Sequence, residues 1–315
     1  MVIKIKIKIA VIGAGFIGRP LIKNLISKGF EVKVLDRNPC PLEFEGLVTW
    51  ISSDIHDLEA LKLVLSDVFV AYHLISSTVP GDGHIDVATE LNENVIEMLA
   101  FIEACLEVGV KRIVFSSSAS VYGIQSELPV RESAVTNPIS VHGIHKLTVE
   151  KFLLLASYTG KIEARIFRIA NPYGPGQSID GRQGFIAMAI GSILRNSPVV
   201  LRNSGQAIRD FIYIDDLVEA LALGGLKNDL PSVMNISSGT GHSLAAVVEI
   251  IARLLGKSIE VTNVRLRLTD IPSSILCNEV MQKNLLFTPT FSIRDGLYKM
   301  LQHHNLIASI HGGDS

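Results

Sequence analysis

Three glycines with the spacing G-x-G-x-x-G are the first residues whose types point to a specific chemistry. Gly13, Gly15 and Gly18 directly follow a short apolar run, residues 9–12, and precede a segment with apolar side chains at helical spacing. The first glycine permits a tight turn, the second lets a phosphate approach bare backbone, and the third lets the helix pack against the strand. The helix start adds free N–H groups and a positive dipole end. The spacing therefore predicts a pyrophosphate site, with a purely structural turn as the alternative.

An acidic residue ends the next predicted strand. Residues 31–35 form an apolar-rich strand, and Asp36 follows it directly. A carboxylate at this point accepts hydrogen bonds from the hydroxyls of an adenosine ribose, so the turn and the acid together predict NAD as cofactor. Arg37 comes next and could accept a 2′-phosphate, which leaves NADP as the alternative. Phe16 and Ile17, inside the glycine turn, are also predicted cofactor contacts.

Asp54 and Ile55 come directly after a third predicted strand, residues 48–51. The carboxyl end of a parallel strand borders the cofactor crevice, so we expect both residues there, with Asp54 reaching the adenine amino group. Its alternative role is the N-cap of the helix predicted over residues 58–65. His73, on the fourth predicted strand, has no obvious partner and is interpreted as a satisfied structural histidine.

Polar side chains gather at two later points of the chain. Serines occupy residues 116–118, just past a strand predicted over residues 112–115, although such a cluster is also common in turns. His142 and Lys146 are four residues apart and therefore lie on one face of a predicted helix. Directed at a nicotinamide, His142 could accept a proton and Lys146 could hold the ribose and tune the acceptor's pKa. A surface pair without function is the alternative.

The elements that position these residues alternate strand, helix and strand. This order predicts an α/β fold with a doubly wound parallel sheet of the Rossmann type, and a smaller C-terminal substrate lobe. The net charge of −2 gives no case for nucleic acid or an anionic membrane surface, and no run approaches ~18 uncharged apolar residues. Three widely spaced cysteines without a CxxC pair predict a reducing, cytoplasmic location and no metal site.

The chain divides into two parts on this reading. We expect the segments around residues 212–214 and 233–236 to return to the main sheet as strands. The predicted division is residues 1–170 for the NAD-binding domain, joined by residues 211–238, and residues 171–210 and 239–315 for the substrate lobe.

A set of short motifs also occurs in a fixed order along nearly the whole chain. They are Gly15-Phe16-Ile17-Gly18, His73-Leu74, Asn94-Val95, Ser117-Ser118-Ala119 with Val121-Tyr122-Gly123, Lys146, Asn171-Pro172-Tyr173-Gly174-Pro175-Gly176, and Arg209-Asp210-Phe211 through Asp215-Asp216. This ordered set resembles the extended short-chain dehydrogenase/reductase family, in its NAD-dependent nucleotide-sugar epimerase/dehydratase branch. The resemblance implies NAD as cofactor and a UDP-sugar as substrate.

The resemblance also implies roles for individual residues. Ser118 matches the active-site Ser or Thr that hydrogen-bonds the sugar 4-hydroxyl, and Lys146 matches the catalytic lysine. The implied substrate contacts are Asn171 near the sugar nucleotide, Arg209 and Arg267 on the diphosphate, Asp270 on the uridine ribose, and Ser274, whose small side chain leaves room for a 2-acetamido group. A planar guanidinium suits phosphate oxygens, and a carboxylate suits a vicinal diol. An ion pair with Asp210 or Asp215 is the alternative role of Arg209.

One departure from the family pattern is chemically important. The tyrosine of the family's YxxxK motif falls on His142. Neutral imidazole, with a reference pKa of ~6.5, is a competent base, but its shorter reach requires a shifted substrate or a bridging water. His145 could also take part, but it projects about 100° per residue away from that face. Two hypotheses follow: catalysis retained through His142, or a weakened binder of cofactor and nucleotide sugar.

Two small residues help to distinguish between the activities found in this family. Ala119 and Ser120 stand where the dehydratases carry Asp-Glu, which argues against dehydration and against the related decarboxylases. The resemblance then favours C4 epimerisation of a UDP-hexose or UDP-N-acetylhexosamine, with a nucleotide-sugar oxidoreductase as the alternative. The predicted helices 91–108 and 143–158 resemble the family's dimer-forming pair, which implies a homodimer with a four-helix contact.

Overall fold

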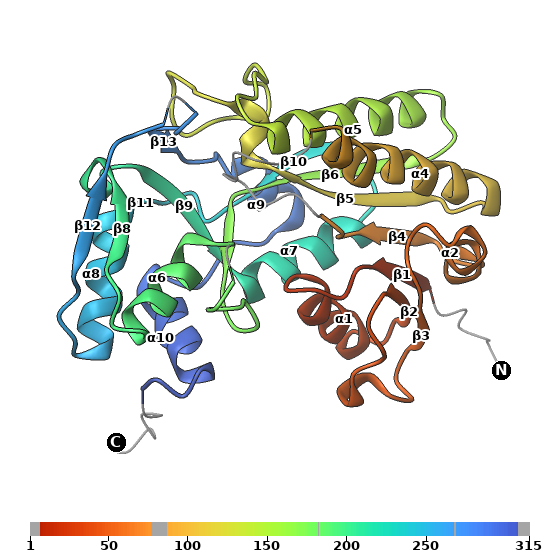
Figure 1. The fold of residues 1–315 in the computed structure, drawn as a ribbon. Helices are drawn as coiled ribbons and strands as arrows, with labels where there is room; N and C mark the ends of the chain where they lie inside the picture. Colours follow the sequence, from red (N-terminus) through yellow and green to blue (C-terminus); the bar gives the residue numbers. More distant parts are fainter. Residues whose placement is uncertain (1–6, 77–86, 182, 268, 308–315) are drawn as a thin grey trace.

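A seven-stranded parallel sheet forms the centre of the computed structural model, which describes residues 7–76, 87–181, 183–267 and 269–307 (Figure 1). Its strands are, in spatial order, β10 (Val233–Ile236), β6 (Glu163–Ile169), β5 (Arg112–Ser118), β4 (Val70–His73), β1 (Lys8–Ile12), β2 (Glu31–Asp36) and β3 (Thr49–Ser52). The order reverses between β1 and β4, and a doubly wound sheet binds its ligand at such a reversal. The predicted α/β fold is confirmed.

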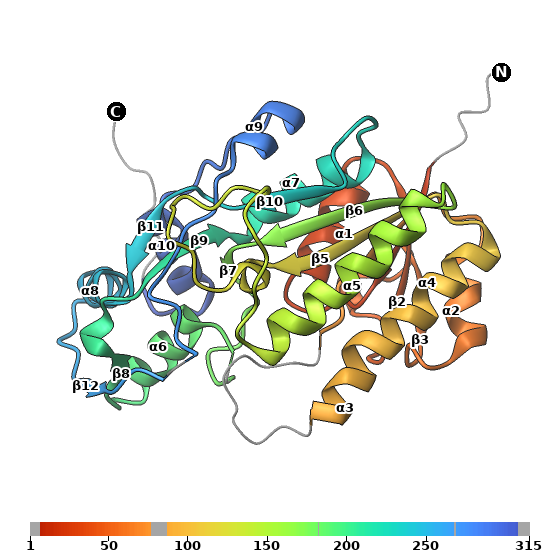
Figure 2. The same ribbon diagram turned by 90° about the horizontal axis from the view of Figure 1, so that it is seen from above.

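Helices cover both faces of this sheet because alternate side chains of its strands point to opposite faces. Ile9 and Val11 of β1 join the core under α1 (Gly18–Ser27) and α7 (Ile214–Leu226), whereas Ala10 and Ile12 join the core on the other face. The second core is covered by α2 (Leu58–Leu65), α4 (Glu97–Val108) and α5 (Val141–Tyr158). Figures 1 and 2 show these two layers on either side of the sheet.

The helix predicted over residues 91–108 starts earlier and contains an irregular turn. It consists of α3 (Val87–Leu91), a π-helical turn (Asn92–Ile96) and α4, and it ends at Gly109 as expected. Gly109 has a φ of 84°, and its N–H bonds the Cys105 carbonyl at 3.1 Å, which is a left-handed helix end. The side-chain amide of Asn94, in the π turn, donates to the Glu90 carbonyl of α3 (2.9 Å). Such turns are often found at functional sites.

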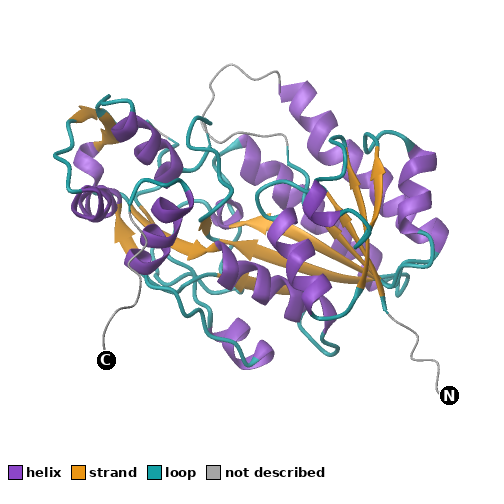
Figure 3. Ribbon diagram, turned by 90° about the horizontal axis from the view of Figure 1, so that it is seen from below, coloured by secondary structure: helices purple, strands orange, loops and turns teal. Residues whose placement is uncertain are grey.

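The C-terminal half adds two small sheets. One joins β7 (Asn171–Tyr173), β9 (Ile208–Tyr213), β11 (Gly241–Ser243) and β13 (Ser273–Ser274); the other pairs β8 (Val199–Arg202) with β12 (Val261–Val264). The expectation that residues 212–214 return to the main sheet is wrong, because they lie in β9 and at the start of α7. The expected strand at residues 233–236 is confirmed as β10. Figure 3 shows the β8–β12 pair apart from the main sheet.

Four further helices lie in the C-terminal half, three of them beside these small sheets and one, residues 279–285, against β10 and α7. They are α6 (Phe185–Leu194), α8 (Leu244–Leu255), α9 (Glu279–Leu285) and α10 (Ile293–His303). In the described ranges, no helix combines the length and the apolar character needed to cross a membrane.

A buried ion pair joins α5 to the main sheet. Glu150 of α5 is fully buried and accepts hydrogen bonds from Arg168 of β6, including one of 2.7 Å from Nη2, and from the Ser117 hydroxyl. The guanidinium of Arg168 also lies over the Tyr122 ring, 4.7 Å from its centroid. A buried carboxylate requires such partners because it has left water. The pair therefore fixes α5 against the strand ends where the predicted catalytic residues lie.

The opposite edge of the sheet carries the single tryptophan of the chain. Trp50 of β3 stacks on Phe44, with ring centroids 6.2 Å apart, and its indole N–H donates to the Asn38 carbonyl (3.0 Å). In the same strand pair Ser52 lies opposite Asp36. Trp50 is thus close to the predicted ribose-binding carboxylate.

Candidate active site

The glycine turn between β1 and α1 has the shape that a pyrophosphate needs. Gly13 has a φ of +96°, and its N–H donates to the Leu35 carbonyl (2.9 Å). A Cβ on Gly18 would lie 2.1 Å from the Gly13 carbonyl oxygen, whereas a Cβ on Gly15 would meet nothing within 4 Å. No side chain caps the start of α1. The bare backbone at Gly15 therefore faces open space beside a helix N-terminus, as anion binding there requires.

Asp36 closes this turn from the end of β2. Its Oδ2 accepts the N–H of Ala14 at 2.7 Å, and its Oδ1 accepts the backbone and side-chain N–H groups of Asn38 at 2.8 and 2.9 Å. An ionised carboxylate has about four acceptor positions, so capacity remains for a ribose hydroxyl. Arg37 is exposed on the loop that follows. The residues of the turn therefore fit a dinucleotide.

The predicted adenine contact Asp54 does not cap the following helix. Asp57 holds that position, since its side chain accepts the Ala60 N–H (3.1 Å), while Asp54 accepts the N–H of His56 (3.0 Å). The alternative role of Asp54 as N-cap is therefore wrong, and its side chain stays partly exposed beside buried Ile55. His56 also contacts Glu97 of α4, with 2.7 Å between Nε2 and Oε1. Sequence analysis did not single out Glu97.

Two glycine variants separate cofactor binding from folding. We expect Gly15→Val to lower NAD affinity roughly tenfold or more, because its side chain fills the space of the pyrophosphate, while the free energy of unfolding changes by less than about 1 kcal/mol. Gly18→Ala is expected to lower both quantities, because its Cβ collides with backbone. Calorimetric titration with NAD and urea unfolding measure them. A Gly15→Val protein that binds NAD like the wild type would contradict the assignment of this turn.

The 3-10 turn that follows Ser118 packs against the start of α5. The Ser118 Oγ accepts hydrogen bonds from the N–H and the hydroxyl of Ser120 (3.2 and 2.9 Å). Ser140 caps α5 through the Gly143 N–H (3.1 Å), and a Cβ on Gly143 would lie 2.6 Å from the Ser120 carbonyl oxygen. This close approach requires glycine at position 143. It places His142 beside the 3-10 turn that follows Ser118, the last residue of β5. The prediction that serines 116–118 come after this strand is wrong, because the strand includes them.

Lys146 is held by the strand beneath it. Its Nζ donates to the Ser116 carbonyl (2.9 Å) and lies 4.8 Å from the centroid of the Phe115 ring. Burial lowers the pKa of Lys146 to about 8, against the opposing effect of the Glu150 carboxylate. Burial also lowers the pKa of His142 to about 3, with smaller contributions from Lys146 and His145. At neutral pH His142 is therefore neutral and Lys146 still carries its proton.

A small cavity brings His142 and Lys146 together with side chains of β4, the π-helical turn and β5. It is lined by His73, Ile75, Asn94, Phe115, His142, His145, Lys146 and Val149. The expectation that His145 points away from the face of His142 is wrong, because residues at i and i+3 are neighbours on a helix. That spacing was visible in the sequence. His73 is not the satisfied histidine expected, since neither ring nitrogen has a partner in the described part of the chain.

The predicted substrate residues meet on the four-stranded sheet. Arg209 of β9 lies opposite His242 of β11 and Ser274 of β13. Asn171 of β7 pairs with Phe211 of β9 and donates to the Asp210 carbonyl (2.8 Å). The structure thus brings Asn171, Arg209 and Ser274 onto one small sheet from separate parts of the sequence.

Arg209 does not pair with the acids beside it in sequence. Buried Asp210 accepts the N–H groups of Ser238, Gly239 and Leu276 and the Ser238 hydroxyl, whereas Arg209 donates to the Ile208 carbonyl (2.8 Å). No ion pair joins Arg209 to Asp210 or Asp215 among the described residues, so that alternative is wrong. Burial lowers the pKa of Arg209, and the Asp270 carboxylate opposes this.

The carboxylate of Asp270 lies among the arginines of the predicted substrate site. Its Oδ2 accepts the Arg267 N–H at 2.7 Å and lies 3.8 Å from Nε of Arg202. Arg202 was not singled out from the sequence, because only the pairing of β8 with β12 brings it to this place. Arginines from three segments are thus arranged near one carboxylate, which is a suitable surrounding for a diphosphate and a ribose diol.

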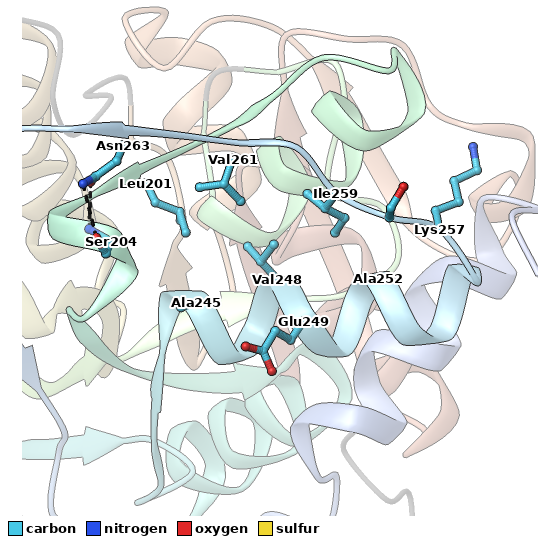
Figure 4. Close-up of a pocket in the computed structure, with 11 residues that line it drawn as sticks. Leu201, Ser204, Ala245, Val248, Glu249, Ala252, Lys257, Ile259, Val261 and Asn263 are labelled. Atoms are coloured by element: carbon cyan, nitrogen blue, oxygen red, sulfur yellow. Dashed lines mark hydrogen bonds between the residues drawn. The ribbon is translucent and has the colours of Figure 1, made fainter.

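The C-terminal half also contains a separate pocket of about 410 Å³ (Figure 4). It lies between α8 and the β8–β12 pair, and the side chains of Val248 and Val261 point into it. None of its lining residues belongs to the predicted cofactor, catalytic or substrate sets. The candidate active site is therefore the region around the smaller cavity.

The fold and the glycine turn are those of a dinucleotide-binding protein, and the comparisons with known proteins identify the family. Residues 9–237 match the model of the NAD dependent epimerase/dehydratase family, so the chain belongs to this family. It is similar to dTDP-4-dehydro-6-deoxyglucose reductase from Escherichia coli, with 27% identity over 300 residues covering 92% of this chain and 95% of the relative.

Two solved structures are similar over nearly their whole length. UDP-glucose 4-epimerase from Thermotoga maritima with UDP-glucose has a TM-score of 0.87 at 27% identity, covering 95% of this chain and 99% of the other. MoeE5 in complex with UDP-glucuronic acid and NAD has a TM-score of 0.85 at 32% identity, with the same coverage. The predicted cofactor NAD is confirmed, and the open backbone at Gly15 fits it.

Proposed function

We propose that this protein is an NAD-dependent 4-epimerase acting on a UDP-hexose or a UDP-N-acetylhexosamine. The observation that carries the proposal is the placement of His142 and Lys146 on the wall of one small cavity, with Lys146 bonded to the carbonyl of Ser116, two residues before Ser118 at the end of β5. NAD, held at the glycine turn and Asp36, would supply a reversible hydride acceptor for C4, and inversion would require the bound 4-keto sugar to turn over before the hydride returns. The 4-keto sugar formed in between needs no further acid, so this sparse set suffices.

Each residue has a role that its surroundings support. Ser118 would orient the 4-hydroxyl, and neutral His142 would accept its proton, either directly or through one water. Charged Lys146 would bind the nicotinamide ribose and stabilise the negative charge that develops on the sugar oxygen. Arg209 and Arg267 would hold the diphosphate and Asp270 the uridine ribose. Ser274, opposite Arg209, would leave room for a 2-acetamido group.

Ala119 and Ser120 also support epimerisation over dehydration. They continue the chain from Ser118 into a 3-10 turn, and neither side chain can act as the acid that expels a 6-hydroxyl. A nucleotide-sugar oxidoreductase is the second candidate, supported by the similarity to the Escherichia coli reductase. The two differ in their use of cofactor, because only the oxidoreductase changes the total amount of NADH over many turnovers.

The direct test is incubation with UDP-glucose and UDP-N-acetylglucosamine, followed by separation of the C4 epimers. We expect interconversion of at least one pair without net NADH, and we expect His142→Ala to lower kcat roughly 100- to 10,000-fold, as loss of a general base does. His303→Ala, an exposed histidine of α10, is the matched control and should leave kcat unchanged.

A catalytically silent nucleotide-sugar binder is the remaining alternative. It would be stabilised by a UDP-sugar without turnover, and His142→Tyr would then gain activity. No interconversion of any nucleotide sugar by NAD-loaded protein would refute the epimerase.

We also infer a homodimer formed by α4 and α5 of two copies. Large apolar side chains are exposed on α5 and on the π-helical turn before α4. They are Ile96, Ile144, Phe152, Leu155 and Tyr158. The exposure of these apolar side chains supports burial against a second copy.

A further inference from the structure

Glu90 of α3 and His145 of α5 form a buried pair that the proposed reaction has not used. Their side chains are 6% and 4% exposed, and 4.0 Å separates the Glu90 Oε2 from the His145 Nδ1. Neither of these two atoms has a hydrogen-bond partner among the described residues. Burial raises the pKa of Glu90 and lowers that of His145. A buried carboxylate and a buried imidazole that face each other in this way are suited to share a proton.

The same pair is connected to the candidate base. His142 and His145 line one cavity, whose volume of about 10 Å³ is roughly what a single water molecule needs. The other titratable groups on its wall are Lys146, already charged, and His73, whose pKa burial lowers to about 3. Glu150 nearby is bound to Arg168 and Ser117. Glu90 is not part of the wall itself and reaches this cavity through His145, since its Oε2 lies 4.0 Å from the His145 Nδ1.

His142 alone is a poor place for a proton to stay. Its imidazolium would be buried and would lie near the charged Lys146, and both effects destabilise it. The proton removed from a sugar hydroxyl would therefore return to the sugar oxygen unless a better acceptor lay next to His142. His145, whose ring faces the Glu90 carboxylate, is such an acceptor because the carboxylate stabilises the charge.

We propose that His145 and Glu90 receive the proton that His142 removes from the sugar hydroxyl, and return it after the hydride has come back. The inference rests on the proposed function. One ring nitrogen of His142 takes the hydroxyl proton while the other releases its own through a bridging water to His145. Glu90 neutralises the imidazolium. The two electrons of the C4–H bond leave with the hydride, so charge and protons balance. Neither residue touches the sugar, and both act through His142.

The test compares His145→Gln and Glu90→Gln in the NAD-loaded protein. Each variant should lower kcat roughly tenfold or more, while KM and the bound NAD content stay within about twofold of wild type. The solvent deuterium isotope effect on kcat should increase in both, because proton transfer becomes slower. Glu103→Gln, an exposed acid of α4, is the matched control and should behave as wild type.

Three results would overturn the proposal. In the first, both variants keep the wild-type kcat and isotope effect. In the second, bound NAD falls and KM rises together with the loss of kcat, which indicates a structural role. In the unaltered protein, the ¹⁵N signal of His145 could fail to shift toward the imidazolium when UDP-sugar is added. This last measurement holds even if a variant does not fold. A wild type that converts no UDP-sugar would instead refute the proposed function, and the relay with it.

Discussion

Replacing Lys146 with methionine is expected to lower kcat roughly 100- to 1,000-fold, the usual loss when one preorganised electrostatic contact is removed. Methionine keeps the length of the side chain but removes the ammonium that donates to the Ser116 carbonyl. Lys151→Met, an exposed position of the same helix, is the matched control and should keep kcat. A Lys146→Met protein with more than about a tenth of the wild-type kcat would contradict the role of the lysine.

The pH dependence gives a second readout for the same residue. Burial places the pKa of Lys146 at about 8 instead of 10.5, so wild-type kcat should fall as pH rises through about 8, and this alkaline limb should be absent from Lys146→Met. The free energy of unfolding should change with pH in the opposite direction to kcat. Between the two pKa values the unfolded chain holds more protons, so the contribution of Lys146 to stability increases as pH rises through that window. Below it, Lys146→Met should melt at a higher temperature than wild type.

Arg168→Met is expected to lower the free energy of unfolding by about 3–5 kcal/mol, because it leaves the fully buried Glu150 carboxylate without its cation. Urea unfolding at neutral pH measures this. The exposed pair Arg195–Asp180 offers the matched control: Arg195→Met should cost less than about 1 kcal/mol, although its ions are also only 3.0 Å apart.

A second substitution separates charge from packing at this position. Adding Glu150→Leu to Arg168→Met removes the stranded carboxylate, and we expect it to recover most of the lost stability. If the double variant is as unstable as Arg168→Met alone, the loss reflects packing of Arg168 on Tyr122 and not the unpaired charge.

The parts of the fold that were predictable depend on local patterns. The apolar run of β1, the spacing of Gly13, Gly15 and Gly18, and the left-handed end at Gly109 are each readable within a few residues. The sheet to which β9 belongs could not be predicted from the sequence. Its residues Phe211, Ile212 and Tyr213 are all buried, as in a strand of the main sheet, and the apolar pattern does not say which sheet buries them.

The candidate site divides in the same way. His142 and Lys146 were visible because their spacing on a helix is a local property. His145 carries the same kind of signal because it lies at i+3 from His142, but as the sequence neighbour of Lys146 it is rotated by about 100° from that residue. Glu90 and Glu150 carried no signal, because an acidic residue in a helical sequence usually faces water. Only the packing of α3 and β6 against α5 explains their burial.

The stacked indole at the edge of the sheet gives the protein a built-in optical label. Trp50 is the only residue of its kind, so all indole emission comes from one place, two positions along β3 from the strand partner of Asp36. Reduced nicotinamide absorbs light where indole emits, and oxidised nicotinamide does not. A transient dimming of this emission after sugar is added would therefore time the redox step inside a single turnover, without any dye or coupling enzyme.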